Sequence, residues 1–186
     1  MSLTLVTAPT SEPVSLSEMK SHLRLDGGDD DAYVSKCLKA ARQWIEGQIK
    51  RSIMAKTYDY NIDYAWPYKD GSIRIDFPVN PVTSVTSITY VDSDGASQTL
   101  ASSQYTVVAR EFNSYIVAAY NVSLPDVRWV PNAITVRFIS GATTAEEDIK
   151  HAVKVLTAHY YENREVSSGT PMAVEALISP YRKVTF

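Results

Sequence analysis

Carboxylates gather in one short stretch of the sequence and are the first candidates for chemistry. Asp26, Asp29, Asp30 and Asp31 lie close enough together to offer the oxygen ligands that Ca²⁺ or Mg²⁺ takes in proteins. Their spacing does not match an EF-hand loop, because counting from Asp26 puts Cys37 where the bidentate glutamate belongs. We therefore expect no metal site here. The stretch is typical of a solvated helix start, where the helix dipole stabilises negative charge.

Histidine and cysteine are the other residues that could ligate a metal or react. His151 and His159 are not spaced as in an HExxH motif, and the one cysteine, Cys37, lies on the apolar stripe of a predicted helix. A buried structural thiol is the expected role of Cys37. His22 has no neighbouring ligand pattern, and we expect His151 to pair at the surface with Glu147.

The sequence contains none of the short motifs that signal a common catalytic or cofactor site. A P-loop, a GxSxG elbow and a dinucleotide glycine pattern are all absent from a chain with 7 glycines. We therefore predict no catalytic residue, no cofactor and no enzymatic activity.

Aromatic residues are abundant and could stack on bases or fill a protein interface. The chain has 12 tyrosines and 3 tryptophans, and several cluster in one segment, namely Tyr58, Tyr60, Tyr64, Trp66 and Tyr68. Alternation along a strand would place half of them in a sheet core, and the remainder suit a protein–protein surface. A net charge of −3 and a pI near 5.6 argue against base stacking, because nucleic-acid binders usually carry a basic footprint.

Length and composition indicate a folded protein without membrane segments. The 186 residues, 45% of them hydrophobic, suffice for one core or for a core with an appended subdomain. The first ten residues lack the basic and apolar regions of a signal peptide, and no later run is long enough to cross a bilayer. We expect the chain to fold in a cytosol.

Two helices are predicted near the amino terminus. Ser15 and Glu18 form a capping box, which predicts a short helix over residues 16–23. A longer helix is expected over 32–51. Its apolar stripe consists of Val34, Cys37, Leu38, Ala41, Trp44, Ile45 and Ile49, with the polar Gln48 among them.

The hydrophobic period then changes from 3.6 to 2, which predicts a β region. Alternating residues mark strands over 58–64 and 73–77, and the β-branched run before Asp92 leads into a hairpin turn that ends at Gly95. Further short strands are expected over 105–108, 115–118 and 133–139.

The clearest helical signature lies in residues 144–165. Thr144 and Glu147 have capping-box spacing, and a buried stripe follows them, formed by Ile149, Ala152, Val153, Leu156 and Tyr160. A last short helix is expected after Thr170 as N-cap and Pro171 as its first residue, stopped by Pro180.

These elements predict an α+β fold in two parts. Residues 1–52 and 142–186 should form a small helical core of two N-terminal helices, one long and one short C-terminal helix, and residues 53–141 an inserted antiparallel β subdomain. We expect Leu38, Trp44, Val153 and Leu156 to meet in the helical core, because each lies at the centre of its helical stripe.

Six phrases in this order resemble a known family. They are EPVSLSEMKSHLRLD, ARQWIEGQ, PVTSVTSITYVDSDG, PNAITVRFISG, IKHAVKVLTAHYYENRE and VEALISPYR. Together they resemble the head–tail connector, or head-completion adaptor, proteins of tailed double-stranded-DNA phages and prophages, over nearly the whole chain.

The resemblance implies a structural virion protein at the head–tail junction, assembled in the bacterial host cytoplasm. It implies a homo-oligomeric ring under the portal protein that extends the DNA conduit and offers a surface to the tail or to a neck protein. DNA would pass through without sequence-specific binding, and no membrane is involved.

The carboxyl-terminal tail is the candidate oligomer interface. Tyr181, Arg182, Lys183 and Phe186 combine aromatic ends with two cations in a segment too short to fold alone. Two alternatives stay open: another neck or tail-completion role, and a nucleic-acid-binding regulator, which a salt-sensitive gel shift would reveal.

Overall fold

The computed structural model describes residues 1–69, 72–163 and 169–182 and divides the chain into two units. A helical unit contains residues 9–54 and 143–186, and a β unit contains residues 1–8 and 55–142. The predicted division put residues 1–52 in the helical part. The structure differs at the amino terminus, because residues 2–7 form a strand that pairs with the β unit.

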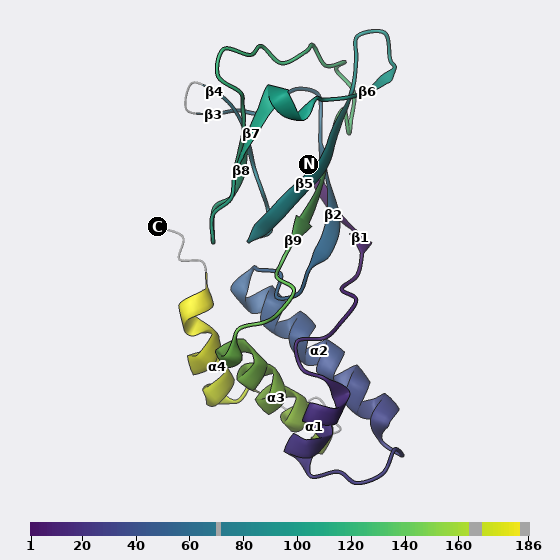
Figure 1. Ribbon diagram of the computed structural model, residues 1–186, viewed down its shortest axis with the longest axis vertical. Coiled ribbons are helices and arrows are strands. Elements are labelled where there is room, and N and C mark those ends of the chain that lie inside the picture. Colours follow the sequence, from purple (N-terminus) through teal and green to yellow (C-terminus); the bar gives the residue numbers. More distant parts are fainter. Residues whose placement is uncertain (70–71, 164–168, 183–186) are drawn as a thin grey trace. The chain divides into compact units, whose positions relative to one another are not determined.

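The helical unit has four α-helices and a terminal 3₁₀ turn within the described residues (Figure 1). They are α1 (Leu16–Leu23), α2 (Asp31–Ile49), α3 (Glu147–Glu162), α4 (Met172–Ile178) and η2 (Ser179–Tyr181). The bounds of α1 match the prediction. Ser15 caps it as expected, because its Oγ accepts a hydrogen bond from the Glu18 N–H at 3.2 Å.

The helical core forms where α2 packs against α3, and α4 packs against α3. Leu38, Val153 and Leu156 are buried in this core as predicted, whereas Trp44 is half-buried at its margin. The physical reason is that the buried stripe of α2 runs through Ala41, Arg42, Ile45, Glu46 and Ile49. Trp44 lies on the flank of that stripe.

The start of α3 departs from the prediction. The N-cap is Glu146 rather than Thr144, and within the described residues no side chain caps this helix. Ala145 is buried, and Glu146 keeps an extended conformation while its carbonyl accepts the Lys150 N–H at 2.9 Å. The chain is therefore still extended where the capping box would have begun a helix. Similarly, Pro171 is the N-cap of α4, one residue later than predicted.

The β unit contains two antiparallel sheets. The larger has the strand order β1-β2-β9-β5-β6 and the smaller β3-β4-β8-β7. The strands are β1 (Ser2–Thr7), β2 (Lys56–Ile62), β3 (Tyr68–Lys69), β4 (Ser72–Asp76), β5 (Val82–Val91), β6 (Ser97–Thr99), β7 (Tyr105–Val108), β8 (Tyr115–Ala118) and β9 (Ile134–Ser140). The antiparallel β insertion of the predicted α+β fold is thus confirmed.

Regular alternation along β2 and β9 separates the two faces of the larger sheet. Ile62, Val136 and Phe138 face a core that it shares with Ile75 and Ile116 of the smaller sheet. The opposite face is polar. Its cross-strand pairs include Asp59 with Arg137 and Asn61 with Thr135. Burial of one face only explains why this region shows a period of two in the sequence.

The predicted hairpin between β5 and β6 is confirmed. The Asp92 carboxylate accepts the Ala96 N–H at 2.8 Å, and Gly95 has φ +91°. A side chain at Gly95 would also collide with the guanidinium of Arg128, 2.3 Å from the position of a Cβ. Nη1 of Arg128 is the far end of a flexible side chain and can move aside, so the positive φ is what favours glycine in this turn.

Candidate assembly surfaces

The acidic stretch before α2 contributes to packing within the helical unit. Asp31 pairs with Lys20 at 2.7 Å, and the Asp30 carboxylate accepts a hydrogen bond from the Tyr161 hydroxyl at 2.5 Å. Among the described residues no three His, Cys, Asp or Glu side chains come together in a group that could hold a metal ion. The carboxylates of Asp26 and Asp29 lie on exposed residues.

The three histidines and the cysteine do not belong to a common metal-binding group in the described part of the chain. Cys37 is buried, and desolvation raises the pKa of its thiol, as suits a packing residue. His22 and His151 are exposed, and His159 Nδ1 lies 3.1 Å from the Asn163 side chain. The expected Glu147–His151 pair is not the contact observed for Glu147, whose carboxylate pairs instead with Lys150 at 2.6 Å.

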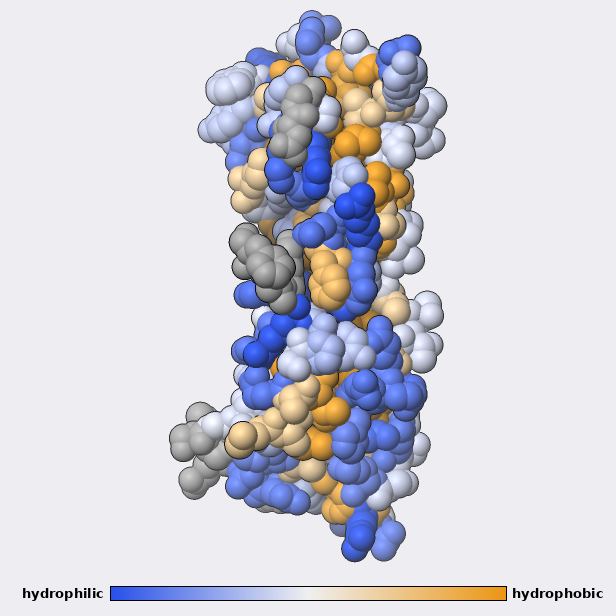
Figure 2. Space-filling model, turned by 90° about the vertical axis from the view of Figure 1, so that its left-hand side faces the viewer, coloured by the Kyte–Doolittle hydropathy of each residue, from blue (hydrophilic) through white to orange (hydrophobic). Residues whose placement is uncertain are grey.

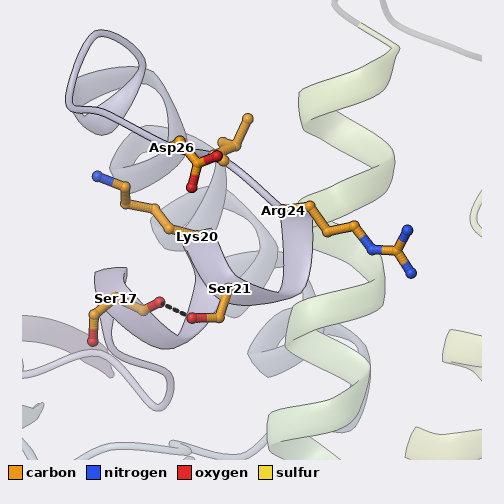
Figure 3. A pocket seen from close by; sticks show the side chains of 6 residues that line it. Ser17, Lys20, Ser21, Arg24 and Asp26 are labelled. Carbon is orange, nitrogen blue, oxygen red and sulfur yellow. Dashed lines mark hydrogen bonds between the residues drawn. The ribbon is translucent and has the colours of Figure 1, made fainter.

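One surface hollow of about 480 Å³ lies beside α1 (Figure 3). Its lining residues are Ser17, Lys20, Ser21, Arg24, Leu25 and Asp26. Ser21 Oγ donates to the Ser17 carbonyl, and the Lys20 ammonium is engaged by Asp31 and by the Gly27 carbonyl. These contacts stabilise α1 and the loop after it, and the hollow gathers no set of reactive groups.

A buried ionic cluster inside the helical unit was missed in the sequence. Arg42 is 2% exposed, and its guanidinium binds Glu12 at 2.5 Å and Glu46 at 2.8 Å. Glu46 also accepts the Ile53 N–H at 3.0 Å. Burial alone would lower the pKa of Arg42, but its hydrogen bonds and attraction to the two glutamates outweigh this and raise it. The cluster connects α2 both to the segment before α1, which contains Glu12, and to the segment after α2, which contains Ile53.

The i,i+4 spacing of Arg42 and Glu46 was the available signal, since such pairs face the same side of a helix. Burial of the pair beside the apolar stripe depends on Glu12, which comes from a distant segment. Local sequence reasoning could not supply that partner.

The structure describes half of the predicted tail interface. Tyr181 packs half-buried against its own helical core, with the Arg51 guanidinium 5.7 Å from its ring centre. A hydrogen bond to the Glu146 carboxylate raises the pKa of Tyr181 to about 12. Arg182 pairs with Glu175. Lys183 and Phe186 lie outside the described residues, and the interface role of this tail stays a prediction.

Exposed aromatic residues in the β unit are further candidates for contacts with other proteins. Tyr64 stacks on Trp129 with ring centres 4.9 Å apart, although Trp129 is 75% exposed. Tyr64 has φ +70°, and its N–H is held by the Val130 carbonyl at 3.0 Å. Tyr68 and Tyr120 are also largely exposed. Rigid, exposed Tyr and Trp side chains suit protein–protein contacts.

Core packing accounts for the other aromatics of the predicted cluster. Tyr58 stacks on Phe138, and Trp66 lies against Tyr90 while its indole N–H donates to the Pro125 carbonyl at 2.8 Å. Figure 2 shows apolar surface interrupted by polar surface on one face of each unit. Exposed aromatic and apolar side chains of this kind suit contacts with other proteins.

Residues 12–171 match the family model described as "Head completion protein". The chain belongs to the head completion protein family. It is a structural protein of the neck, the head–tail junction of a phage-like particle. Within the described residues no helix combines the length and apolar character needed to cross a membrane. No curated protein sequence matches the chain.

Solved structures support this assignment over the whole chain. A chain of "Virion of native gene transfer agent (GTA) particle" is 28% identical with a TM-score of 0.81. Chains of "Neck of native GTA particle computed with C12 symmetry" and "Neck of empty GTA particle computed with C6 symmetry" are each 26% identical, with TM-scores of 0.81 and 0.78. Each match covers 100% of this chain and 97% of the other.

Proposed function

We propose that copies of this chain form a closed ring in the neck. The ring lies under the portal protein, extends the DNA conduit and presents a surface to the tail or to the next completion protein. The observation that carries this proposal is the full-length similarity to chains from GTA necks with C12 and C6 symmetry. Cyclic symmetry requires each copy to contact two neighbours through two different patches.

Charge supports passage of DNA without tight binding. The net charge of −3 gives no basic footprint, so phosphates are not drawn strongly to the subunit as a whole. Cations at the surface are in part neutralised by carboxylates, as Arg137 is by Asp59 and Lys69 is by Asp76. A conduit subunit of this kind lets DNA slide.

The ring is tested by electron microscopy of the purified protein, alone and mixed with its portal. We expect rings at high protein concentration or density bound to the portal. A protein that remains monomeric in both samples would refute the proposal.

We further propose that the chain acts without catalysis. Purified protein should show no hydrolase, nuclease or transferase activity with or without a divalent metal. Nuclease activity that follows the protein through purification and disappears after Asp29, Asp30 and Asp31 are all changed to Asn would contradict this and restore the acidic stretch as a metal site.

A further inference from the structure

Strand β1 is an open edge of the larger sheet. Among the described residues it pairs with β2 alone, and all six of its residues are exposed. Its sequence, SLTLVT, contains no charged residue and no proline. Natural proteins usually protect a sheet edge with such residues, because unpaired N–H and C=O groups accept a strand from another chain.

The two leucines of β1 extend the apolar face of the sheet. Leu3 is paired with Tyr60 and Leu5 with Tyr58, so these leucines share the face on which Tyr58 stacks on Phe138. Leu3 is nevertheless 37% exposed and Leu5 50% exposed. The apolar face of the sheet therefore extends to the edge strand β1, where its leucines are exposed to solvent.

The opposite edge of the same sheet is β6. Its three residues, Ser97–Thr99, are all exposed and uncharged. Four antiparallel steps separate β1 from β6, so the two edge strands run in the same direction. The sheet thus carries two different open edges, one on each side. A ring subunit needs two such patches for its two neighbours.

We propose that the β1 edge, with Leu3 and Leu5, is an interface between copies and receives the β6 edge of a second copy. Backbone hydrogen bonds between the two edges would continue the sheet from one copy to the next. The leucines would add apolar burial at the joint. This inference rests on the proposed ring and names the surface that closes it.

The first test introduces charge at the edge. In the variant Leu3→Lys/Leu5→Lys we expect the protein concentration for half-maximal ring formation to rise by about tenfold or more, because lysines would be desolvated between strands. The matched control is Thr106→Lys, on an exposed residue of β7, the edge strand of the smaller sheet in the same unit, and it should form rings like the unmodified protein. Circular dichroism and thermal melting check that both variants fold.

The outcomes separate this inference from the proposed ring. Unchanged ring formation by the double variant overturns the β1 interface and leaves the ring proposal standing. Absence of rings in the unmodified protein, alone and with portal, overturns both. Loss of rings in the double variant but not in Thr106→Lys supports the interface.

The second test identifies the neighbour. A photo-reactive benzoylphenylalanine in place of Leu5 should cross-link ring samples into dimers, and peptide mapping should find the cross-link in the segment containing Ser97–Thr99. Cross-links to another segment, to the portal alone, or none in samples that contain rings would overturn the pairing of β1 with β6.

Discussion

At the scale of single residues, the buried ion pairs of Arg42 give a direct test of what stabilises the helical unit. We expect Arg42→Met to lower the free energy of unfolding by about 3–5 kcal/mol, because the buried Glu46 would lose its ion pair with Arg42. Urea unfolding measures the change. Adding Glu46→Gln to Arg42→Met should recover part of the loss, since a neutral amide depends less than a carboxylate on the Arg42 cation.

A matched control is the surface pair of Arg137 and Asp59. The geometry is good, with both contacts at 2.7 Å, but Arg137 is 45% exposed. Arg137→Met should therefore cost clearly less stability than Arg42→Met. If both Arg→Met variants lowered the free energy of unfolding by the same amount, burial of Arg42 would not explain its contribution to stability.

Tyr181 provides a pH-dependent test of how the carboxyl-terminal turn is held. Its pKa is raised to about 12 by the Glu146 carboxylate, so the folded state favours the neutral phenol. The stabilisation is fully present below the ordinary tyrosine pKa of about 10 and is lost as pH rises toward 12. Tyr181→Phe should thus be less stable than the unmodified protein at pH 8, and the difference should shrink between pH 10 and 12. A difference that stays constant over this range would contradict the Glu146 contact.

At the scale of elements, the two units invite a test of independent folding. We expect the helical unit to fold when residues 55–142 are replaced by a short flexible linker, because its core contains residues of α1 to α4 and of the segments flanking them. Circular dichroism should show a helical protein that melts cooperatively. A gradual, non-cooperative melt would mean that the helices need the β unit.

Local patterns predicted the elements well where one face is buried along a whole helix or strand. The stripe of α3 and the alternation of β9 were readable for that reason. The start of α3 was mispredicted, because Glu146, two residues beyond Thr144, still has an extended backbone and is itself the N-cap. Trp44 was placed too centrally, since its size and spacing do not reveal that the charged pair of Arg42 and Glu46 takes the inner position.

Long-range pairing was the part that the sequence could not reveal. Residues 2–7 were assigned to the helical part and not to a strand, because the partner strand β2 begins about fifty residues later, beyond two helices. The same holds for Glu12, whose role depends on contact with Arg42. Candidate interface residues are even harder to predict from the sequence, because a tryptophan such as Trp129 gives no local signal of whether it is exposed or buried.

At the scale of the whole molecule, the central claim is that this head completion protein works as one subunit of a ring. Electron microscopy of the purified protein at high concentration, alone and mixed with its portal, tests that claim most directly. The account predicts closed rings with a central opening, or ring-shaped density on the portal. Particles that stay monomeric in both samples would contradict it.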